Sequence, residues 1–407
     1  MERIYGTITA AGLVLVLGIG VIASPRNAAA ENPAWRVGDV FIGTDDGSYQ
    51  VFDRHGGFKH LLRDERGGYT TDCGFNPSLD KLYTTNYTHS KVVVFDDEAQ
   101  HDILQTVHSG ETSPRGHSSA LVFDADGNLF VGHPDGNHLI HKYNDTGMLL
   151  EAFEVAVEER GTSGIDLAAD QRTLFYTSEG RMIQRFDTAA NTQLEDFAEL
   201  PGEGPAFALR LLPPGDGSGG LLVADEAQIK RLDGNGQVVQ TYDAAGQDAW
   251  FALNLDPNGT SFWAADSETD QLYRFHIATG AIEQQFRAGP GNTIFGVCLK
   301  GELTAGVSQA ETVLPGFYSL AQNAPNPFNP STQIEYQLPE SGEVRLVIYN
   351  LLGQQIRTLV QGAREAGIHR VGWNGQDGYG RAVSSGLYLY RFESEGLVQT
   401  RRMVLLK

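Results

Sequence analysis

The chain has 407 residues, 48 of them glycine, and its 51 acidic residues against 30 basic ones give a formal net charge of −21. This length favours two or three domains, and the negative charge argues against nucleic-acid binding, which depends on cations that contact phosphates. The two cysteines exclude a disulfide-rich scaffold and a zinc site of four cysteines.

Residues 1–30 have the features of a secretory signal peptide. Arg3 precedes an apolar stretch from Ile8 to Ala23, and small residues follow up to Ala30. A charged start, an apolar centre and a small-residue cleavage site are typical of such signals. The apolar stretch is short for a transmembrane helix, which needs about 20 residues. We therefore expect cleavage after Ala30 and no transmembrane segment in the mature chain.

Residues 31–303 contain one sequence unit six times. Each copy has a strand, a polar gap, a second strand, a turn and a third strand. The copies enter their last hairpin at equivalent positions, namely Asp53, Asp96, Asn144, Asp187, Asp233 and His276. These positions are 43, 48, 43, 46 and 43 residues apart, which is typical of four-stranded propeller blades. The fold class is therefore predicted to be all-β, with a six-bladed β-propeller at residues 31–303.

A further strand precedes five of the six units, and the first unit lacks one. A matching segment follows the sixth copy at Phe295–Leu299, which predicts that it completes the first blade and closes the ring. Cys73 and Cys298 would then lie in neighbouring inner strands, where oxidation of an exported chain can join them. Their positions are one residue out of register, however, which predicts that the side chains face opposite ways and argues against a disulfide.

The aligned inner strands also predict how the blades pack. Phe207, Phe251 and Phe295 share one face, and small residues occupy the other face, as close interdigitation requires. This block resembles the NHL-repeat, gluconolactonase-like and related six-bladed propellers in its repeat rhythm and in turns such as Asp124–Phe130.

Polar residues of the inner strands are the candidates for a ligand site in the channel. They are Asp72, His117, Asp166, Arg210 and Asn254. One interpretation is a polar pocket or metal site around the axis. The favoured interpretation is a structural ion pair between Asp166 and Arg210, which occupy equivalent positions in successive blades.

No cofactor is predicted, and calcium is the one cation kept open. Metal-dependent propeller lactonases and lyases need several carboxylate, amide or imidazole ligands around one cation, and the candidates include a single histidine and a few scattered acids. Asp124, Asp126 and Asn128 alternate like the start of a calcium loop. Since no glutamate follows at the required spacing, a hairpin turn is the favoured interpretation.

The sequence pattern changes at residue 318, after a linker at 304–317. Three prolines between Pro325 and Pro330 forbid a helix and predict an extended lead-in. Alternating segments then predict strands at 332–338, 344–350, 354–360, 369–373, 387–392 and 398–406. Short strands with Gly, Pro and Ser turns predict a small Ig-like β-sandwich at 318–407.

This segment closely resembles the type A sorting domain of proteins exported by the type IX secretion system, which is related to the Ig-like domain of the flagellar hook-capping protein. The shared motifs lie at 325–332, 349–353, 373–381, 385–390 and 402–407. The residues assigned to the sorting motif are Pro325, Asn326, Pro327, Phe328, Asn329, Pro330, Gly353, Trp373, Gly375, Asp377, Gly380, Gly386, Tyr388 and Lys407. The resemblance implies export across both membranes, followed by surface attachment or release, and no catalysis by this domain.

The negative charge belongs to the first of these domains. Residues 31–317 hold 19 basic and 43 acidic residues, whereas 318–407 hold nine basic and seven acidic residues. No catalytic motif is recognised, so the chain is predicted to be a non-enzymatic binding protein, secreted or on the surface of a Gram-negative-type bacterium. Its expected partners are the type IX secretion machinery and a small-molecule, glycan or protein ligand. The alternative is a secreted propeller hydrolase or lyase, with Asp72, His117, Asp166 and Asn254 around a divalent cation.

Overall fold

A computed structural model describes residues 34–64, 66–97, 101–108, 117–136, 138–215, 217–288, 294–303, 319–338, 342–394 and 397–406. The predicted signal peptide at 1–30 and the predicted linker at 304–317 lie outside the described residues. The regular structure of the described residues consists of β-strands, which confirms the all-β fold class. Within these ranges no helix is long and apolar enough to cross a membrane.

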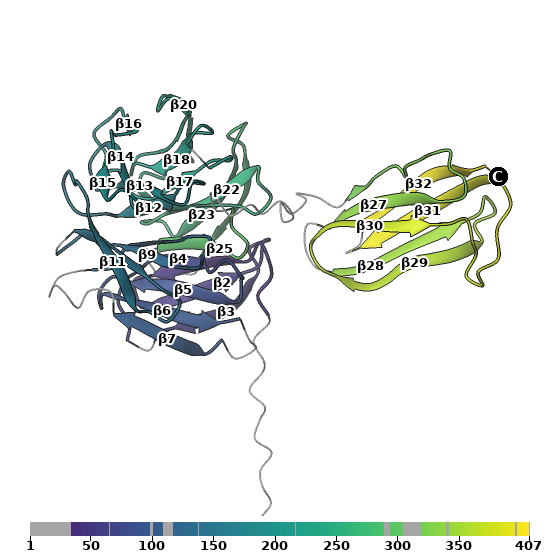
Figure 1. Ribbon diagram of the computed structural model, residues 1–407, viewed down its shortest axis with the longest axis horizontal. Helices are drawn as coiled ribbons and strands as arrows, with labels where there is room; N and C mark the ends of the chain where they lie inside the picture. The colour runs from purple at the N-terminus through teal and green to yellow at the C-terminus, as the bar shows by residue number, and fades with distance from the viewer. Residues whose placement is uncertain are drawn as a thin grey trace, which may run out of the picture. The chain divides into compact units, whose positions relative to one another are not determined.

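Residues 34–303, here called the six-sheet domain, fold into six antiparallel sheets (Figure 1). The first three sheets have four strands each: β25 (Ile294–Leu299), β1 (Val40–Thr44), β2 (Ser48–Phe52) and β3 (Phe58–Arg63); β4 (Thr70–Phe75), β5 (Lys81–Asn86), β6 (Lys91–Asp96) and β7 (Ile103–His108); β8 (Ala120–Phe123), β9 (Leu129–Gly132), β10 (Leu139–Tyr143) and β11 (Leu149–Glu154).

The fourth sheet has β12 (Gly164–Leu167), β13 (Thr173–Thr177), β14 (Met182–Asp187) and β15 (Thr192–Gln193), with β16 (Ala198–Glu199) also paired to β14. The last two sheets comprise β17 (Leu209–Leu211), β18 (Leu221–Ala224), β19 (Ile229–Leu232) and β20 (Val238–Tyr242); and β21 (Trp250–Leu255), β22 (Ser261–Asp266), β23 (Gln271–His276) and β24 (Ile282–Arg287). Each sequence repeat thus supplies most of one sheet.

The last strand of this domain belongs to the first sheet, as predicted. β25 pairs antiparallel with β1, so that Cys298 lies opposite Phe41, and in Figure 1 the green β25 lies beside purple strands from the start of the chain. The innermost strands of consecutive sheets contact one another in the order β25, β4, β8, β12, β17, β21 and back to β25. The contacts between the sheets therefore form a closed circuit.

Apolar side chains fill the spaces between consecutive sheets. One cluster joins Phe41 of the first sheet to Phe75 of the second, and equivalent clusters follow from each sheet to the next. The circuit ends with a cluster that packs Trp263 of the sixth sheet against Val40 of the first. Burial of apolar area stabilises each junction by roughly 25 cal/mol per Å².

The Asp or Asn that precedes the last hairpin in five of the six units has a local structural role. Its carboxylate or amide oxygen accepts backbone N–H groups of the turn that follows: Asp53 from His55 and Gly57, Asn144 from Thr146 and Met148, Asp233 from Asn235 and Gln237. Such side chains stabilise tight turns by satisfying the backbone locally. Asp124 caps its own turn in the same way, with Gly127 at φ +81°, so this segment is the predicted hairpin turn.

The two cysteines form a disulfide, with 5.5 Å between their Cα atoms, and the prediction against it was wrong. Cys298 in β25 and Cys73 in β4 belong to the same apolar cluster between the first two sheets. These sheets pack face to face, so the face of β25 that meets β4 corresponds to the opposite face of β4. An offset of one residue therefore turns the two side chains toward each other, since successive side chains alternate between faces.

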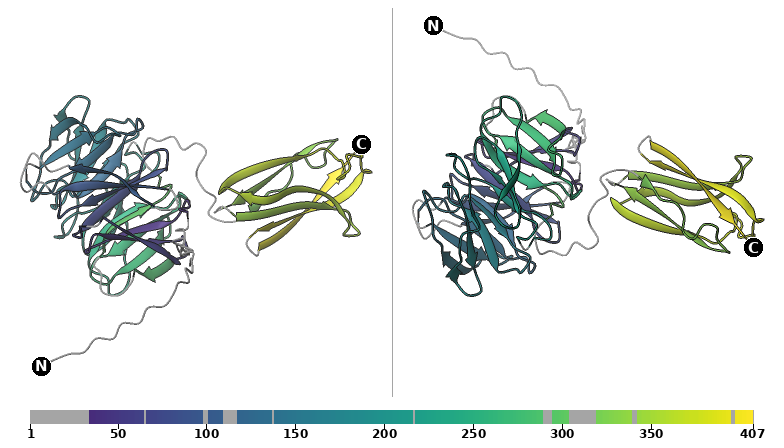
Figure 2. Two further views of the ribbon diagram at one scale, coloured as in Figure 1. Left: turned by 90° about the horizontal axis from the view of Figure 1, so that it is seen from below. Right: turned by 90° about the horizontal axis from the view of Figure 1, so that it is seen from above.

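Residues 319–406 form a separate sandwich of two sheets, whose long strands are visible in Figure 2. One sheet has β26 (Ser319–Leu320), β27 (Thr332–Leu338) and β30 (Gly367–Trp373), and the other has β29 (Gln355–Arg364), β28 (Gly342–Tyr349), β31 (Gly386–Ser394) and β32 (Leu397–Leu405). Its core includes Phe328, Trp373 and Tyr390. The six predicted strands are confirmed, with ends that differ by up to four residues.

Candidate functional site

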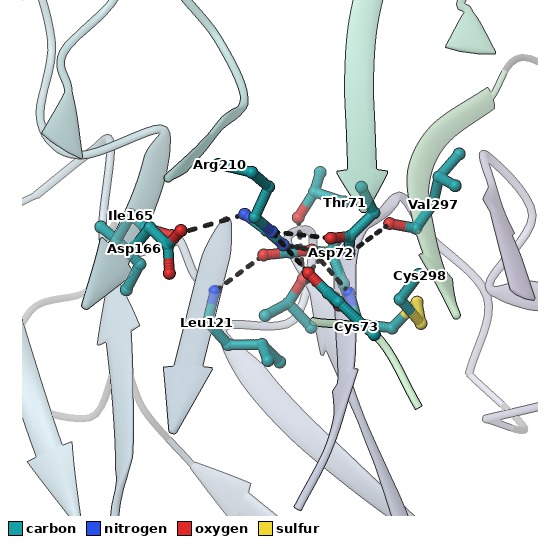
Figure 3. Close-up of polar contacts among 12 residues, drawn as sticks. Thr71, Asp72, Cys73, Leu121, Ile165, Asp166, Arg210, Val297 and Cys298 are labelled. Atoms are coloured by element: carbon teal, nitrogen blue, oxygen red, sulfur yellow. Dashed lines mark hydrogen bonds and ion pairs between the residues drawn. A yellow bond between two sulfur atoms is a disulfide. The ribbon is translucent and has the colours of Figure 1, made fainter. Parts of the chain in front are cut away.

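Four of the five candidate channel residues meet where the innermost strands converge. Asp72, Asp166, Arg210 and Asn254 come from β4, β12, β17 and β21 respectively, and Glu302, just after β25, joins them. This group is called the central cluster. Figure 3 shows the guanidinium of Arg210 between the side chains of Asp166 and Asp72.

Arg210 is the centre of the cluster and is only 6% exposed. Its Nε donates to Glu302 Oε1 and Asn254 Oδ1, both at 2.8 Å, and its Nη1 donates to the carbonyl of Leu209 at 2.9 Å. Its ion pairs are with Glu302 and, at 3.6 Å, with Asp72. The predicted ion pair with Asp166 is therefore corrected, because that carboxylate accepts backbone N–H groups and attracts Arg210 without direct contact.

Three other members of the cluster, Asp72, Asp166 and Asn254, form hydrogen bonds that join neighbouring sheets. Each also bonds to the backbone N–H of the residue that follows it. The joining bonds reach the next innermost strand: Asp72 accepts from the N–H of Leu121 (2.9 Å), Asp166 accepts from the N–H of Leu211 (2.8 Å), and Asn254 donates to the carbonyl of Val297 (3.2 Å). They occur at every second junction and fix the register of the sheets.

This arrangement does not suit a divalent cation. A metal site needs several oxygen or nitrogen ligands whose lone pairs converge on one point. Here the oxygens of Asp72, Asp166 and Asn254 are aimed at backbone N–H groups, and the Arg210 guanidinium occupies the space among them. The fourth ligand of the alternative hypothesis, His117, lies elsewhere. We therefore derive no catalytic step through a metal.

Burial controls the protonation of the cluster. It raises the pKa of Glu302 to about 8 and that of Asp72 to about 6, although Arg210 acts in the opposite direction on both. Burial also raises the pKa of Asp166, again against the attraction of Arg210. Burial alone would lower the pKa of Arg210, but the neighbouring carboxyl groups outweigh it, so the guanidinium stays charged.

A pH dependence of stability follows from Glu302. Its pKa is raised from 4.5 to about 8 on folding, so the folded protein binds more protons than the unfolded chain in this window. The free energy of unfolding therefore falls as the pH rises, by roughly 3 kcal/mol between about pH 5 and pH 7.5. We expect Glu302→Gln to remove most of this decline, measured by urea unfolding at both pH values. The exposed control Glu268→Gln keeps the wild-type decline, and an unchanged decline in Glu302→Gln contradicts the assignment.

The fifth candidate, His117, lies away from the central cluster. It precedes β8, its ring contacts that of Tyr87 edge to face at 4.2 Å, and its Nδ1 lies 3.6 Å from Asp135 Oδ2. Arg160 donates to Asp135, to Tyr87 and, through two bonds of 3.1 Å, to Glu179. These five residues come from connections between strands of the second, third and fourth sheets, and they are called the charged arc.

Hydrogen bonds fix the charges of this arc. Burial alone would raise the pKa of Asp135, but hydrogen bonds from Arg160 and Tyr87 outweigh it and hold that pKa below its usual value. The hydrogen bond to Asp135 raises the pKa of Arg160 in turn. At neutral pH the arc therefore holds Asp135 as a carboxylate and Arg160 as a cation.

Four aromatic side chains form a second group, the aromatic arc. Phe251 and Phe295 are the second residues of β21 and β25. Phe207 lies two residues before β17, and Tyr69 lies just before β4. Their rings touch in series, with centroids 4.7 Å apart for Phe207 and Phe251, 5.4 Å for Phe251 and Phe295, and 5.1 Å for Phe295 and Tyr69. All four remain at least partly exposed.

The aromatic arc lines a pocket to which the charged arc is connected through Ser163. It is lined by the three phenylalanines of the aromatic arc together with Thr71 and Ser163, and Asp72 and Arg210 also contribute to its lining. Ser163 connects the arcs, because its hydroxyl donates to Glu179 at 2.8 Å. A second pocket, which includes Pro77 and Glu302, is also lined by Arg210. Residues of the central cluster thus line two pockets, and three residues of the aromatic arc line one of them.

Sequence reasoning missed Glu302 and most of both arcs. Glu302 follows the last repeat and has no counterpart in the other units, so aligning the repeats does not place it among the inner-strand candidates. The aromatic arc was visible as Phe207, Phe251 and Phe295, each 44 residues apart, but it was interpreted as packing. Tyr87, Asp135 and Glu179 each follow the second strand of a sheet, and this shared place was the available signal.

Most residues assigned to the predicted sorting motif maintain the fold of the C-terminal domain. Phe328 and Tyr388 both pack against the Trp373 ring, with ring centroids 5.5 and 5.2 Å from it. Four glycines have positive φ at turns or a strand start, namely Gly353, Gly375, Gly380 and Gly386. Asp377 accepts the backbone N–H groups of Tyr379 and Arg381.

The lead-in supplies most of the exposed residues of the predicted motif. Pro325, Asn326, Pro327, Asn329 and Pro330 are exposed, and Asn326 still accepts the N–H of Val404 at 2.9 Å. Phe328, between them, pairs with Leu405 in a parallel bridge. Lys407 lies outside the described residues.

The described residues therefore define an all-β protein with many four-stranded antiparallel sheets and a C-terminal Ig-like domain. Residues 328–396 match the family model of the FlgD Ig-like domain. This agrees with the hook-capping relationship expected from the motifs of the segment. No curated protein matches the chain.

Proposed function

We propose that the chain is a secreted or cell-surface binding protein, with a six-bladed β-propeller that carries the ligand site and a type IX sorting domain that directs export. The propeller proposal rests on the closed circuit of contacts among the innermost strands and on the apolar cluster between the last sheet and the first. A ring of radially arranged sheets is the propeller architecture. Its repeats resemble those of NHL and gluconolactonase-like propellers.

The observation that carries the export proposal is the disulfide between Cys73 and Cys298. Disulfides form and persist in oxidising compartments outside the cytoplasm. The match of residues 328–396 to an Ig-like family model and the motifs of the lead-in support the same direction. The signal-like residues 1–30 supply the first membrane crossing in this proposal.

A binding role is favoured over catalysis because the polar residues of the central cluster are already engaged in hydrogen bonds and ion pairs within the protein. Asp72, Asp166 and Asn254 are engaged with backbone groups, and Arg210 is held by Glu302. A general base or metal ligand needs a free acceptor aimed at a substrate. Partly exposed side chains around the pocket are instead arranged as a surface that can receive a ligand.

Truncation at the domain boundary tests the export proposal. We expect a chain that ends at residue 316 to remain in the cell envelope, with at least tenfold less on the surface or in the medium than the full chain. Cell fractionation and immunoblotting measure this, with a periplasmic protein as the control for leakage. A chain without residues 1–30 should stay in the cytoplasm. Equal amounts of truncated and full chain outside the cell overturn the sorting role.

A further inference from the structure

We propose that the two arcs bind a neutral glycan, with a sugar ring stacked on the aromatic arc and its hydroxyl groups hydrogen-bonded to the charged arc. This deepens the binding role proposed above and assigns its site and ligand class. The aromatic arc offers apolar ring surface. The charged arc offers carboxylates, one of which, Glu179, is hydrogen-bonded to Ser163 in the lining of the same pocket as the phenylalanines. A sugar presents both matching surfaces, with C–H groups on its faces and hydroxyl groups around its edge.

The hydrogen-bond balance of the charged arc favours a ligand that donates. The five hydrogen bonds of Arg160, to Asp135, Tyr87 and Glu179, match the five N–H donors of a guanidinium. An anionic ligand would therefore have to displace a carboxylate. Asp135 and Glu179 keep acceptor capacity, because a carboxylate accepts about four hydrogen bonds. Ligand hydroxyl groups can fill these places without breaking the ion pairs.

The position of Arg160 disfavours a cationic ligand. Its guanidinium lies within 3.2 Å of both carboxylates, so it already balances one of their two negative charges. A second cation at the same carboxylates would meet the repulsion of the first. A neutral hydroxylated ligand avoids both this repulsion and the desolvation of a charge.

The small volume of the pocket favours a ligand that lies mostly outside it. Its internal volume is about 20 Å³, which is enough for one water-sized guest. Small metabolites are generally enclosed by deep pockets that bury most of their surface. A sugar chain instead needs a platform, and a series of touching aromatic rings provides one.

The backbone around the aromatic arc argues against a peptide ligand. Peptides commonly bind by adding a strand to a free sheet edge. Here the carbonyl of Phe207 accepts from the hydroxyl of Thr177, and the N–H of Phe207 donates to the carbonyl of Ala224. The carbonyl of Tyr69 accepts from the N–H of Tyr87. These backbone groups are already hydrogen-bonded, so recognition depends on side chains.

Calorimetric titration of the purified full chain tests the proposal. The probes are neutral tetrasaccharides of glucose, mannose, galactose and N-acetylglucosamine, compared with tetramers of glucosamine and galacturonic acid and with a mixture of neutral octapeptides. We expect at least one neutral tetrasaccharide to bind. For that probe, Phe251→Ala and Glu179→Gln should each weaken binding at least tenfold, as expected for residues central to a small interface.

Two exposed tyrosines provide a test variant and a matched control whose substitution leaves the protein core intact. Tyr69 of the aromatic arc is 45% exposed and Tyr379 of the C-terminal domain is 86% exposed. Tyr69→Ala should weaken binding at least fivefold, and Tyr379→Ala should leave it unchanged. Binding of charged tetramers or peptides alone, no binding of a neutral tetrasaccharide at millimolar concentration, or binding unaffected by Tyr69→Ala and Glu179→Gln overturns the proposal. Export plays no part in this titration, so either proposal can fail alone.

Discussion

Replacing Cys73 and Cys298 together by alanine is expected to lower the free energy of unfolding of the six-sheet domain by about 3–5 kcal/mol. The disulfide spans 225 residues of sequence and joins β25, the strand that completes the first sheet, to the second sheet. A crosslink across so long a loop restricts the unfolded chain strongly. In the folded state it also fastens the junction where the two ends of the domain meet. Urea unfolding measures the loss.

The reduced wild-type protein is the control for this prediction. Its free energy of unfolding should fall by a similar amount, since breaking the bond chemically removes the same crosslink. Each single substitution should match the double one. Alkylation of both cysteines in the native protein before any reduction, or equal stability of the oxidised protein and the double variant, contradicts the closing role of the disulfide.

Arg210→Met is expected to lower the free energy of unfolding by roughly 3–5 kcal/mol near pH 7.5, because it leaves buried carboxyl groups without their counter-charge. Glu302 and Asp72 both make ion pairs with Arg210, and Asp166 lies in its field. The loss should be smaller near pH 5, where protonation neutralises part of this charge. Urea unfolding at the two pH values measures both effects.

Two further variants separate this effect from a general loss of an arginine. Arg181→Met removes an exposed ion pair with Glu199 and should change the free energy of unfolding by less than about 0.5 kcal/mol. Adding Asp72→Asn to Arg210→Met should restore part of the stability near pH 7.5, since it removes the uncompensated charge of the ion-pair partner whose pKa is about 6. Wild-type stability of Arg210→Met refutes the role of the central cluster in joining the sheets.

The fold was predictable from sequence because each repeat carries its own local signals. Asp53, Asn144 and Asp233 occupy equivalent positions in three of the repeats, and the structure shows that each caps a hairpin turn. The completing role of residues 295–299 followed from the missing strand of the first unit and is confirmed by the pairing of β25 with β1. The disulfide was missed because the alignment of the repeats assigns an offset of one residue to opposite faces of a strand. In the structure opposite faces of β25 and β4 meet, so the same offset turns the two cysteines toward each other.

The site was less predictable because its residues do not share one periodicity. The inner-strand position identified Asp72, Asp166, Arg210 and Asn254, all of which meet. Their chemistry depends on Glu302, which lies beyond the repeat. Residues in the connections between strands, such as Asp135 and Arg160, show no alternation of apolar and polar residues. Only the folded chain brings them together in the charged arc.

Hydroxyl-radical footprinting of the full chain, with and without the best-binding neutral tetrasaccharide, is the most direct test of ligand binding at the two arcs. Aromatic side chains at a binding surface lose oxidation when a ligand covers them. The account predicts protection of Tyr69, Phe207, Phe251 and Phe295, with unchanged oxidation of the exposed Phe58 and Tyr379. Unchanged oxidation of the four aromatic residues, or protection at Phe58 or Tyr379 instead, would contradict it.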